Sequence, residues 1–248
     1  MYLNICLRPS NEILRLPMHY NRLIQAAIYT NLGSDLAEFL HSCGFTANQR
    51  SFKLFTFSRM IGEYRLDKAK NEIIFFKELK LVVSSPLLQF CTSLLNHLLT
   101  SGVIYLGEEI AEITGINVET PKVVTEEVEI RLLSPVVVYS TFLKPEGGKY
   151  TCYFQPGEGE FTRLIESNLR KKYEAFYQRT PPSGEVKIKV LGRPKFNLVM
   201  YKDTPIKGYT CHLKLTGPPD LLQMGVDAGL GSKGSQGFGC VEVVKEII

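Results

Sequence analysis

The sequence predicts an α+β protein made of two tandem domains of the same type. The 248 residues suit two domains of ordinary size. Apolar residues alternate in some segments and recur about every 3.6 residues in others, as strands and helices require. One order of elements also occurs twice, namely strand, helix, strand, strand, helix, strand. This is the order of a ferredoxin-like (RRM-like) domain, and we place the two domains at residues 1–122 and 123–248.

The first domain is predicted to begin with a strand over residues 2–8, where apolar and polar side chains alternate. Two amphipathic helices follow. Their apolar stripes are Tyr20, Leu23, Ile24, Ala27 and Ile28 in the first helix and Leu36, Phe39, Leu40 and Cys43 in the second. The remaining elements, in chain order, are strands over 54–61 and 72–79, a helix that starts at Ser85 and Pro86, and a strand over 103–106.

The second domain repeats the order of elements, without a residue-by-residue match to the first. Its elements, in chain order, are one or two strands over 128–139, a helix over 157–178, strands over 186–191 and 207–215, a short helix over 219–228 and a last strand over 238–244. Residues 150–154 and 195–201 remain as extra segments, which we expect to pair as an inserted hairpin.

Composition restricts the class of protein. With 44% hydrophobic and 22% charged residues, the chain is typical of globular proteins that bury a core. No apolar run reaches the roughly 18 residues that span a bilayer, and residues 1–10 do not resemble a leader, so we expect a cytoplasmic protein with no membrane partner. The six cysteines form no C-x-x-C pair, and no set of His, Cys and acidic residues has metal-ligand spacing. We therefore expect neither a metal ion nor a cofactor.

Charge is distributed unevenly along the chain, although the net charge is only +4. Residues 101–130 contain seven glutamates and one lysine, whereas residues 185–215 contain seven lysines or arginines and two acids. A local basic strip can bind a polyanion even when the total charge is small. A solvated strand face explains the same residues equally well.

Residues 229–239 contain five glycines among eleven residues. Glycine permits positive φ angles and a close approach of the backbone to a ligand. A dinucleotide-binding fingerprint is excluded because a helix, not a strand, precedes the segment, and no Gly-Lys-Ser/Thr of a Walker loop is present. Two interpretations remain: a loop whose amides contact phosphates with help from Lys233, or a tight connection between a helix and a strand.

The glycine-rich ending resembles a known family signature. Residues 229–239, after the helical residues 220–225, are similar to the C-terminal signature of the CRISPR-associated repeat-RNA (precursor crRNA) processing endoribonucleases, within the repeat-associated RNA-binding superfamily. The resemblance covers nearly the whole chain and also implies two ferredoxin-like domains. It implies RNA contacts from Gly229, Gly231, Lys233, Gly237, Phe238 and Gly239.

Three further segments resemble the settings of this family's catalytic Tyr, His and Lys. They are residues 27–29, which end at Tyr29, residues 39–41, which end at His41, and residues 52–58, which contain Lys53. The resemblance implies that these three residues are catalytic. Helical spacing agrees for two of them, because Tyr29 and His41 lie off the apolar stripes and are expected to be displayed.

RNA carries its own nucleophile, the 2′-hydroxyl beside each phosphate, so cleavage needs proton removal, proton donation and stabilisation of charge. A histidine such as His41 exchanges a proton near neutrality, and a lysine such as Lys53 suits the phosphorane. Tyr29 is a poor base unless its pKa is perturbed, and it can instead position the 2′-hydroxyl. The resemblance implies Tyr29 as base and His41 as acid, but the residues themselves leave the reverse assignment open.

The predicted function is therefore metal-independent cleavage of precursor CRISPR RNA within its repeats, which leaves 2′,3′-cyclic phosphate and 5′-hydroxyl ends. CRISPR repeat RNA is the expected partner, with Arg193 and Lys195 as preferred contacts. An interference complex and a homodimer are partners that the sequence leaves open. One alternative is a non-catalytic RNA-binding subunit of such a complex, which has no need of the Tyr, His and Lys set. Another is a nucleotide-binding metabolic enzyme on the same fold.

Overall fold

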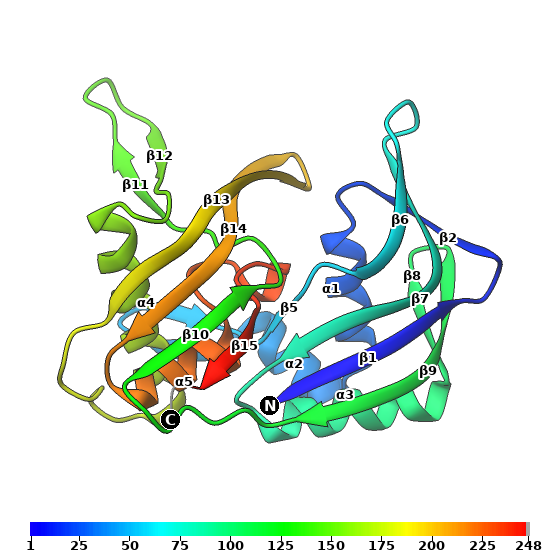
Figure 1. Ribbon diagram of the computed structural model, residues 1–248, viewed down its shortest axis with the longest axis horizontal. Helices are drawn as coiled ribbons and strands as arrows, with labels where there is room; N and C mark the ends of the chain where they lie inside the picture. The colour runs from blue at the N-terminus through cyan, green and yellow to red at the C-terminus, as the bar shows by residue number, and fades with distance from the viewer. Residues whose placement is uncertain (247–248) are drawn as a thin grey trace.

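A computed structural model describes residues 1–246, which form two domains side by side, each with a sheet whose helices lie against one face (Figure 1). The first element is β1, whose start lies at the contact between the domains. The elements up to β9 belong to the first domain, and those from β10 onward belong to the second. No helix in residues 1–246 has the length and apolar composition needed to cross a membrane.

The first sheet is antiparallel and has the ferredoxin-like arrangement. Its central strands are β1 (Tyr2–Pro9) and β7 (Glu72–Ser84), and β9 (Glu109–Glu119) pairs with the free side of β1. The other strands are β2 (Ile13–Pro17), β5 (Thr56–Phe57) and β6 (Ile61–Asp67), which pair with β7, and β8 (Val103–Leu106), which pairs with β9. The helices are α1 (Asn21–Thr30), α2 (Ser34–Ser42) and α3 (Leu88–Ser101). A small hairpin of β3 (Phe45–Ala47) and β4 (Arg50–Phe52) follows α2.

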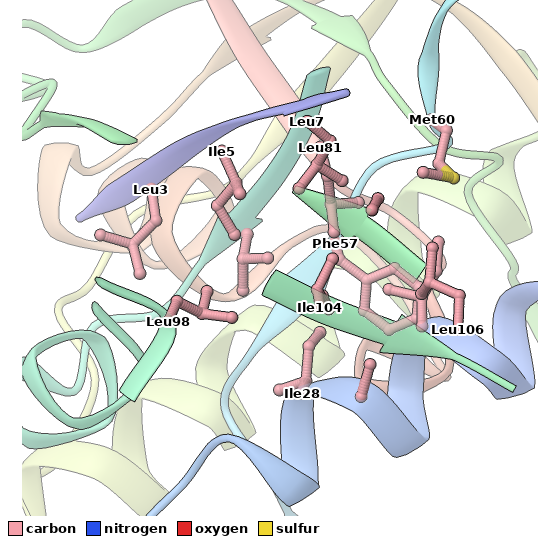
Figure 2. Packing of buried hydrophobic residues seen from close by; sticks show 14 of the residues in the cluster. Leu3, Ile5, Leu7, Ile28, Phe57, Met60, Leu81, Leu98, Ile104 and Leu106 are labelled. Carbon is pink, nitrogen blue, oxygen red and sulfur yellow. The ribbon is translucent and has the colours of Figure 1, made fainter. Parts of the chain in front are cut away.

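Alternation along β1 produces the core of the first domain. Leu3, Ile5 and Leu7 are buried on one face of the strand, because every second side chain of a strand points the same way. Figure 2 shows them directed toward Ile28 of α1 and Leu98 of α3. Each aliphatic side chain buried in this way stabilises the fold by about 1.5–3 kcal/mol.

The second sheet repeats the arrangement in the strand order β13 (Lys187–Tyr201), β14 (Thr204–Thr216), β10 (Glu127–Leu132) and β15 (Val241–Glu246). Two helices, α4 (Gly159–Tyr177) and α5 (Pro219–Ala228), pack on it, and the single-turn η1 (Gly234–Gln236) lies in the glycine-rich loop. A separate hairpin is formed by β11 (Tyr139–Leu143) and β12 (Lys149–Tyr153). The predicted pair of ferredoxin-like domains is thus confirmed.

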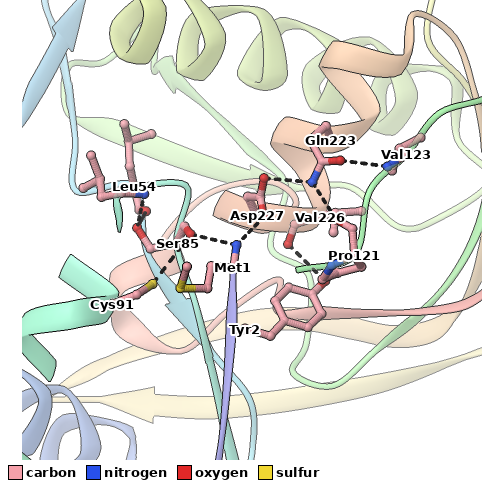
Figure 3. Close-up of polar contacts among 11 residues, drawn as sticks. Met1, Tyr2, Leu54, Ser85, Cys91, Pro121, Val123, Gln223, Val226 and Asp227 are labelled. Atoms are coloured by element: carbon pink, nitrogen blue, oxygen red, sulfur yellow. Dashed lines mark hydrogen bonds and ion pairs between the residues drawn. The ribbon is translucent and has the colours of Figure 1, made fainter. Parts of the chain in front are cut away.

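Polar contacts between the start of β1 and the end of α5 join the two domains (Figure 3). The amino group of Met1 lies 2.7 Å from a carboxylate oxygen of Asp227 and donates a hydrogen bond of 3.1 Å to the carbonyl of Ser85. The Tyr2 hydroxyl donates to the carbonyl of Val226. These bonds fix the first strand of one domain against the last helix of the other.

Several predicted strands of the first domain have different bounds. The predicted strand 54–61 is wrong, because only residues 56–57 of it pair before β6 begins at Ile61. The strand over 103–106 exists as β8, but the strand that completes the sheet beside β1 is β9, which was not predicted. The short β2 and the hairpin of β3 and β4 were also missed. The helix predicted from Ser85 begins at Leu88, and the Ser85 hydroxyl accepts a hydrogen bond from the Leu87 amide before it.

The predicted inserted hairpin of the second domain is wrong in its pairing. Residues 150–154 overlap β12, which pairs with β11, whereas residues 195–201 continue β13 and pair with β14. A register shift between Leu191 and Lys195 interrupts β13, which explains why the sequence suggested two segments. The last strand begins at Val241, because Phe238 and Gly239 belong to the loop before it. The boundary at residues 122 and 123 lies between β9 and β10 and stays a prediction.

Candidate active site

The three predicted catalytic residues lie together, although they come from separate segments. Tyr29 is on α1, His41 is on α2 and Lys53 directly follows β4. The rings of Tyr29 and His41 are 6.2 Å apart between centroids and nearly perpendicular. The Lys53 ammonium donates a hydrogen bond of 3.0 Å to the backbone carbonyl of His41. The fold therefore brings a phenol, an imidazole and an ammonium group to one place.

Tyr29 is held by the core of the first domain and is not fully displayed as predicted. Its ring is half-buried and meets the buried Phe55 ring edge-on, with 5.7 Å between the centroids. Burial raises the pKa of Tyr29 to about 12, and the neighbouring Tyr201 adds to the increase. A phenol with that pKa stays protonated near neutral pH, where it donates hydrogen bonds and does not accept protons.

His41 lies on the last turn of α2 and is exposed, as its position off the apolar stripe predicts. The stripe itself was misjudged, because Leu40 is buried whereas Phe39 and Cys43 are exposed. The Phe39 ring packs edge-on against Phe45 of β3, with 5.3 Å between the centroids, and not into the sheet. The hairpin of β3 and β4 thus replaces part of the expected core contact of α2.

Lys53 also stabilises the end of α2. The final carbonyls of a helix lack partners within it and carry partial negative charge, so a cation there is favourable. The carbonyl of His41 is one of them, and Lys53 is its donor. Burial lowers the pKa of Lys53, whereas the neighbouring Cys43 raises it. Lys53 therefore holds the turn that carries His41, and it also lines a neighbouring cleft.

A basic cleft of about 850 Å³ opens beside Lys53, between the two domains. Its walls come from residues 50–55, from β11, from α4 and from the glycine-rich loop. The described residues that line it include six cations and no acid. The cations are Arg50, Lys53, Arg163, Lys171, Lys172 and Lys233. A concave surface with one sign of charge attracts a polyanion. Tyr29 and His41 do not line the cleft, and they adjoin it through Lys53 and Phe55.

No metal centre is formed by the described part of the chain. Within residues 1–246, no three His, Cys, Asp or Glu side chains gather as metal ligands would.

The glycine-rich loop is bonded to both domains. From the first domain, the Asn21 amide donates to the carbonyls of Gln236 and Gly237, and the Thr56 hydroxyl donates to the carbonyl of Phe238. From the second domain, the Val137 carbonyl accepts a hydrogen bond of 2.8 Å from the amide of Ser232. The loop is thus part of the contact between the domains.

Two of its glycines have no room for a side chain. Gly239 has a φ of +72°, and a Cβ atom there would lie 1.9 Å from the carbonyl oxygen of Leu230. Gly237 has a φ of +82°, and a Cβ atom there would lie 2.3 Å from the Phe57 ring. Tight packing within the protein explains both glycines, which favours the interpretation as a helix-to-strand connection.

The residues predicted to bind RNA fall into three groups. Gly229, Gly237, Phe238 and Gly239 are buried inside the protein, and the Phe238 ring is wholly enclosed, so we do not place RNA on them. Gly231 and Lys233 line the cleft, where the Lys233 ammonium lies 5.6 Å from the centre of the Tyr139 ring. Arg193 and Lys195 are exposed on β13 and lie outside the cleft lining.

Four cleft cations were not singled out from the sequence: Arg50, Arg163, Lys171 and Lys172. Arg50 lies on β4, and Arg163 and Lys171 lie on α4, on exposed or half-buried surface where no local pattern marks them. Lys172 did carry a signal, because it occupies the apolar stripe of α4 that contains Ile165 and Leu169. A lysine at such a position is rarely accidental, since a buried charge is costly.

Family comparisons cover both domains of the chain. Residues 15–115 match the family described as CRISPR-associated protein Cas6, N-terminal, and residues 118–243 match CRISPR associated protein Cas6, C-terminal. The CRISPR-associated endoribonuclease Cas6 of Pyrococcus furiosus is 30% identical over 238 residues, which cover 92% of this chain and 84% of the relative. The CRISPR-associated endoribonuclease Cas6 1 of Methanocaldococcus jannaschii is 26% identical over 237 residues, which cover 93% and 88%.

Solved structures agree in fold over the full length. A structure described as CRISPR associated protein Cas6 has a TM-score of 0.79 and 24% identity and covers 99% of each chain. A Cas6-related protein from Pyrococcus furiosus has a TM-score of 0.86 and 19% identity, again over 99% of each chain. At these identities the likeness shows the fold, and the sequence matches show the family. The chain belongs to the Cas6 family of CRISPR-associated endoribonucleases.

Proposed function

We propose that this protein cleaves precursor CRISPR RNA within its repeats, without a metal ion, through attack of a 2′-hydroxyl on the adjacent phosphate. One observation carries the proposal within the family: Tyr29, His41 and Lys53 meet beside a cleft whose charged lining residues, among those described, are all cations. The two curated relatives are named endoribonucleases, which supports the same activity here.

In the proposed reaction, the 2′-oxygen forms a bond to phosphorus and the bond from phosphorus to the 5′-oxygen breaks. The 2′-hydroxyl proton passes to the His41 imidazole, and the imidazolium so formed gives a proton to the departing 5′-oxygen. The RNA strand is cut with a 2′,3′-cyclic phosphate on one product and a 5′-hydroxyl on the other. No water and no external nucleophile takes part in this step.

We assign proton transfer to His41 and a donor role to Tyr29. An imidazole gains and loses a proton near neutral pH, whereas the Tyr29 phenol, with a pKa of about 12, does not. The protonated phenol instead donates a hydrogen bond to the phosphate or the 2′-oxygen. Lys53 places a positive charge beside the phosphorane, where negative charge develops. This assignment differs from the expectation that Tyr29 is the base.

The cleft is the proposed path of the RNA next to the cut. Arg163 and Lys171 of α4 and Lys233 of the loop supply cations along it, and Lys53 connects it to His41. Such contacts to phosphates give affinity but carry no sequence information. The exposed Arg193 and Lys195 of β13 offer a second basic surface for another part of the repeat.

The test is cleavage of a repeat RNA by the purified protein in excess EDTA, followed by analysis of the product ends. We expect cleavage at one position in the repeat, with a cyclic phosphate and a 5′-hydroxyl. A repeat RNA with a 2′-deoxy nucleotide at that position is the matched control and should stay intact. Cleavage that requires Mg²⁺ and leaves a 5′-phosphate would contradict the mechanism.

A further inference from the structure

Lys172 is a buried cation that points from α4 into the start of the glycine-rich loop. It is 5% exposed and lies on the stripe of α4 that also buries Leu169 and Ala175. Its ammonium donates hydrogen bonds to the carbonyls of Ala228 at 3.1 Å, Gly229 at 2.6 Å and Gly231 at 3.3 Å. The salt bridges of residues 1–246 include none to Lys172. Three backbone carbonyl oxygens therefore solvate this charge.

The carbonyls come from a place that needs a donor. Ala228 is the last residue of α5, and the final carbonyls of a helix have no partner within it. The negative end of the helix dipole also favours a cation there. These interactions offset part of the cost of the buried charge, although burial still lowers the pKa of Lys172 to about 7. The Lys172 ammonium thus caps the C-terminal end of α5, a role that backbone amides of the following loop often have.

The bonded carbonyls belong to the segment that builds one wall of the basic cleft. Gly231 lines the cleft two residues before Lys233, and its φ of +69° turns the chain there. A Cβ atom on Gly231 would lie 2.5 Å from the Val137 carbonyl, so the chain has little freedom on that side. Lys172 fixes the segment from the opposite side. The wall is consequently held between α4 and the segment before β11 that contains Val137.

We propose that Lys172 is a positioning residue that fixes the glycine-rich loop as a wall of the RNA cleft, and so sets RNA affinity without contacting a phosphate. The proposal rests on the proposed function, because it takes RNA as the occupant of the cleft. Its neighbour Lys171 is the natural comparison. Lys171 lies on the same helix and lines the same cleft, but it is half-exposed and makes no bond to the loop.

The first test compares Lys172→Met with Lys171→Met in binding a repeat RNA that carries a 2′-deoxy nucleotide at the cut, over a range of KCl concentrations. A lysine that neutralises a phosphate contributes about 0.7 to the slope of log affinity against log salt for single strands. We expect Lys171→Met to lower that slope by about this amount. Lys172→Met should weaken binding by about tenfold and leave the slope unchanged, because the loss is geometric. The fold-loss of RNA affinity in Lys172→Met should also exceed the fold-loss of its single-turnover cleavage rate at saturating protein.

The second test needs no RNA and separates this inference from the proposed function. Hydrogen exchange in the RNA-free Lys172→Met protein should accelerate at the amides of residues 229–239, while Lys171→Met should leave them as in the wild type. If the wild type binds no repeat RNA, the proposed function fails, yet this measurement still reports on Lys172. Unchanged exchange in Lys172→Met would overturn the positioning role.

A third measurement on the wild-type protein keeps the idea testable if Lys172→Met does not fold. Labelling of amines with an acylating reagent should miss Lys172 both with and without RNA, because its ammonium is enclosed. Lys171 and Lys233 should be labelled in the free protein and protected by repeat RNA. If Lys172 is labelled in the free protein and RNA suppresses that labelling, Lys172 contacts RNA directly and the proposal is contradicted. The proposal is also contradicted if Lys172→Met lowers the slope of log affinity against log salt by about 0.7 relative to the wild type.

Discussion

The Tyr29, His41 and Lys53 cluster and the glycine-rich loop are the two regions that the sequence marks most clearly, and the fold treats them in opposite ways. The cluster leaves His41 exposed, and Lys53 lines the cleft while its ammonium is bonded to the His41 carbonyl. The loop encloses Phe238 and packs its glycines against the protein itself. A distinctive pattern can therefore mark an accessible side chain such as His41 or a packed one such as Phe238.

The two regions are nevertheless in contact. Thr56, three residues after Lys53, donates a hydrogen bond of 2.8 Å to the carbonyl of Phe238. Asn21 of α1, the helix that carries Tyr29, donates to the loop carbonyls of Gln236 and Gly237. The loop consequently supports the segments on which the cluster is built, so its effect on activity is expected to be indirect.

The largest effect should come from His41→Ala. Proton transfer typically contributes about 10² to 10⁴-fold to a rate, so the single-turnover rate should fall at least about a hundredfold. RNA affinity should stay within a few-fold, because one exposed imidazole supplies only a modest contact. Lys53→Ala is the contrasting variant and should lower both rate and affinity, since its charge acts on the phosphate before and during the reaction. A normal rate for His41→Ala would favour the non-catalytic RNA-binding subunit.

Gly239→Ala should destabilise the fold by at least about 2 kcal/mol, because the new Cβ atom meets the Leu230 carbonyl and the backbone has a positive φ. For a chain of this size, the melting temperature should fall by about 4–8 °C. Gly147→Ala is the matched control, with a φ of +87° and no atom within 4 Å of the added Cβ. Thermal unfolding is measured for both variants and for Lys233→Ala. Gly239→Ala tests the packing of the loop, whereas Lys233→Ala removes a side chain that was predicted to contact RNA. Equal melting temperatures for all three would show that the loop is not a packing element.

The pH dependence of cleavage separates His41 from Tyr29. A base with a pKa of about 12 is protonated throughout neutral pH, so its reactive fraction rises about tenfold for each pH unit up to that pKa. Proton transfer by an imidazole instead levels off or declines above neutrality. We expect the wild-type rate to be flat or falling between about pH 8 and 10, after subtraction of RNA hydrolysis without protein. Tyr29→Phe should lower the rate about tenfold without a change in the shape of the profile. A steep rise in the wild type that Tyr29→Phe abolishes would make Tyr29 the base.

The smallest effects should come from the peripheral cations. The double variant of Arg163→Ala and Lys171→Ala should reduce the salt slope of RNA binding by up to about 1.4, which corresponds to two phosphates. The matched double variant, with Arg193→Ala and Lys195→Ala on β13, should also reduce the salt slope of RNA binding. Its loss of RNA affinity should be smaller. Binding titrations at several salt concentrations measure both. A larger loss from the β13 pair would move the main RNA surface away from the cleft.

Much of the fold was predictable because its main elements have clear periods. The helical stripes of α1, α4 and α5 follow directly from burial on one face. In β1 the apolar Leu3, Ile5 and Leu7 share one face, although Tyr2 and Asn4 on the other face are also buried. The strand β9 was missed because only Ala111 of it is buried, so this glutamate-rich strand shows little alternation of apolar residues. The register shift in β13 likewise divides one strand into two apparent segments.

Within the candidate site, the sequence indicated a position most clearly where the family resemblance and the helical spacing pointed to the same residue. Tyr29 and His41 lie off their stripes, and the fold places Lys53 beside them. The cleft was not predictable, because it exists only where α4 faces residues 50–55 of the other domain. The raised pKa of Tyr29 is equally a property of the folded chain, since burial beside Phe55 causes it.

The most direct test of the account is the structure of the protein with a repeat RNA that carries a single 2′-deoxy nucleotide at the cut. We expect the phosphate at the cut to lie within about 3 Å of a donor atom of His41 or Lys53, with the adjoining strand in the basic cleft. The 2′-carbon of the deoxy nucleotide should face the Tyr29 hydroxyl or the His41 imidazole. A phosphate at the cut that lies against Arg193 and Lys195, away from His41, would contradict the central claim.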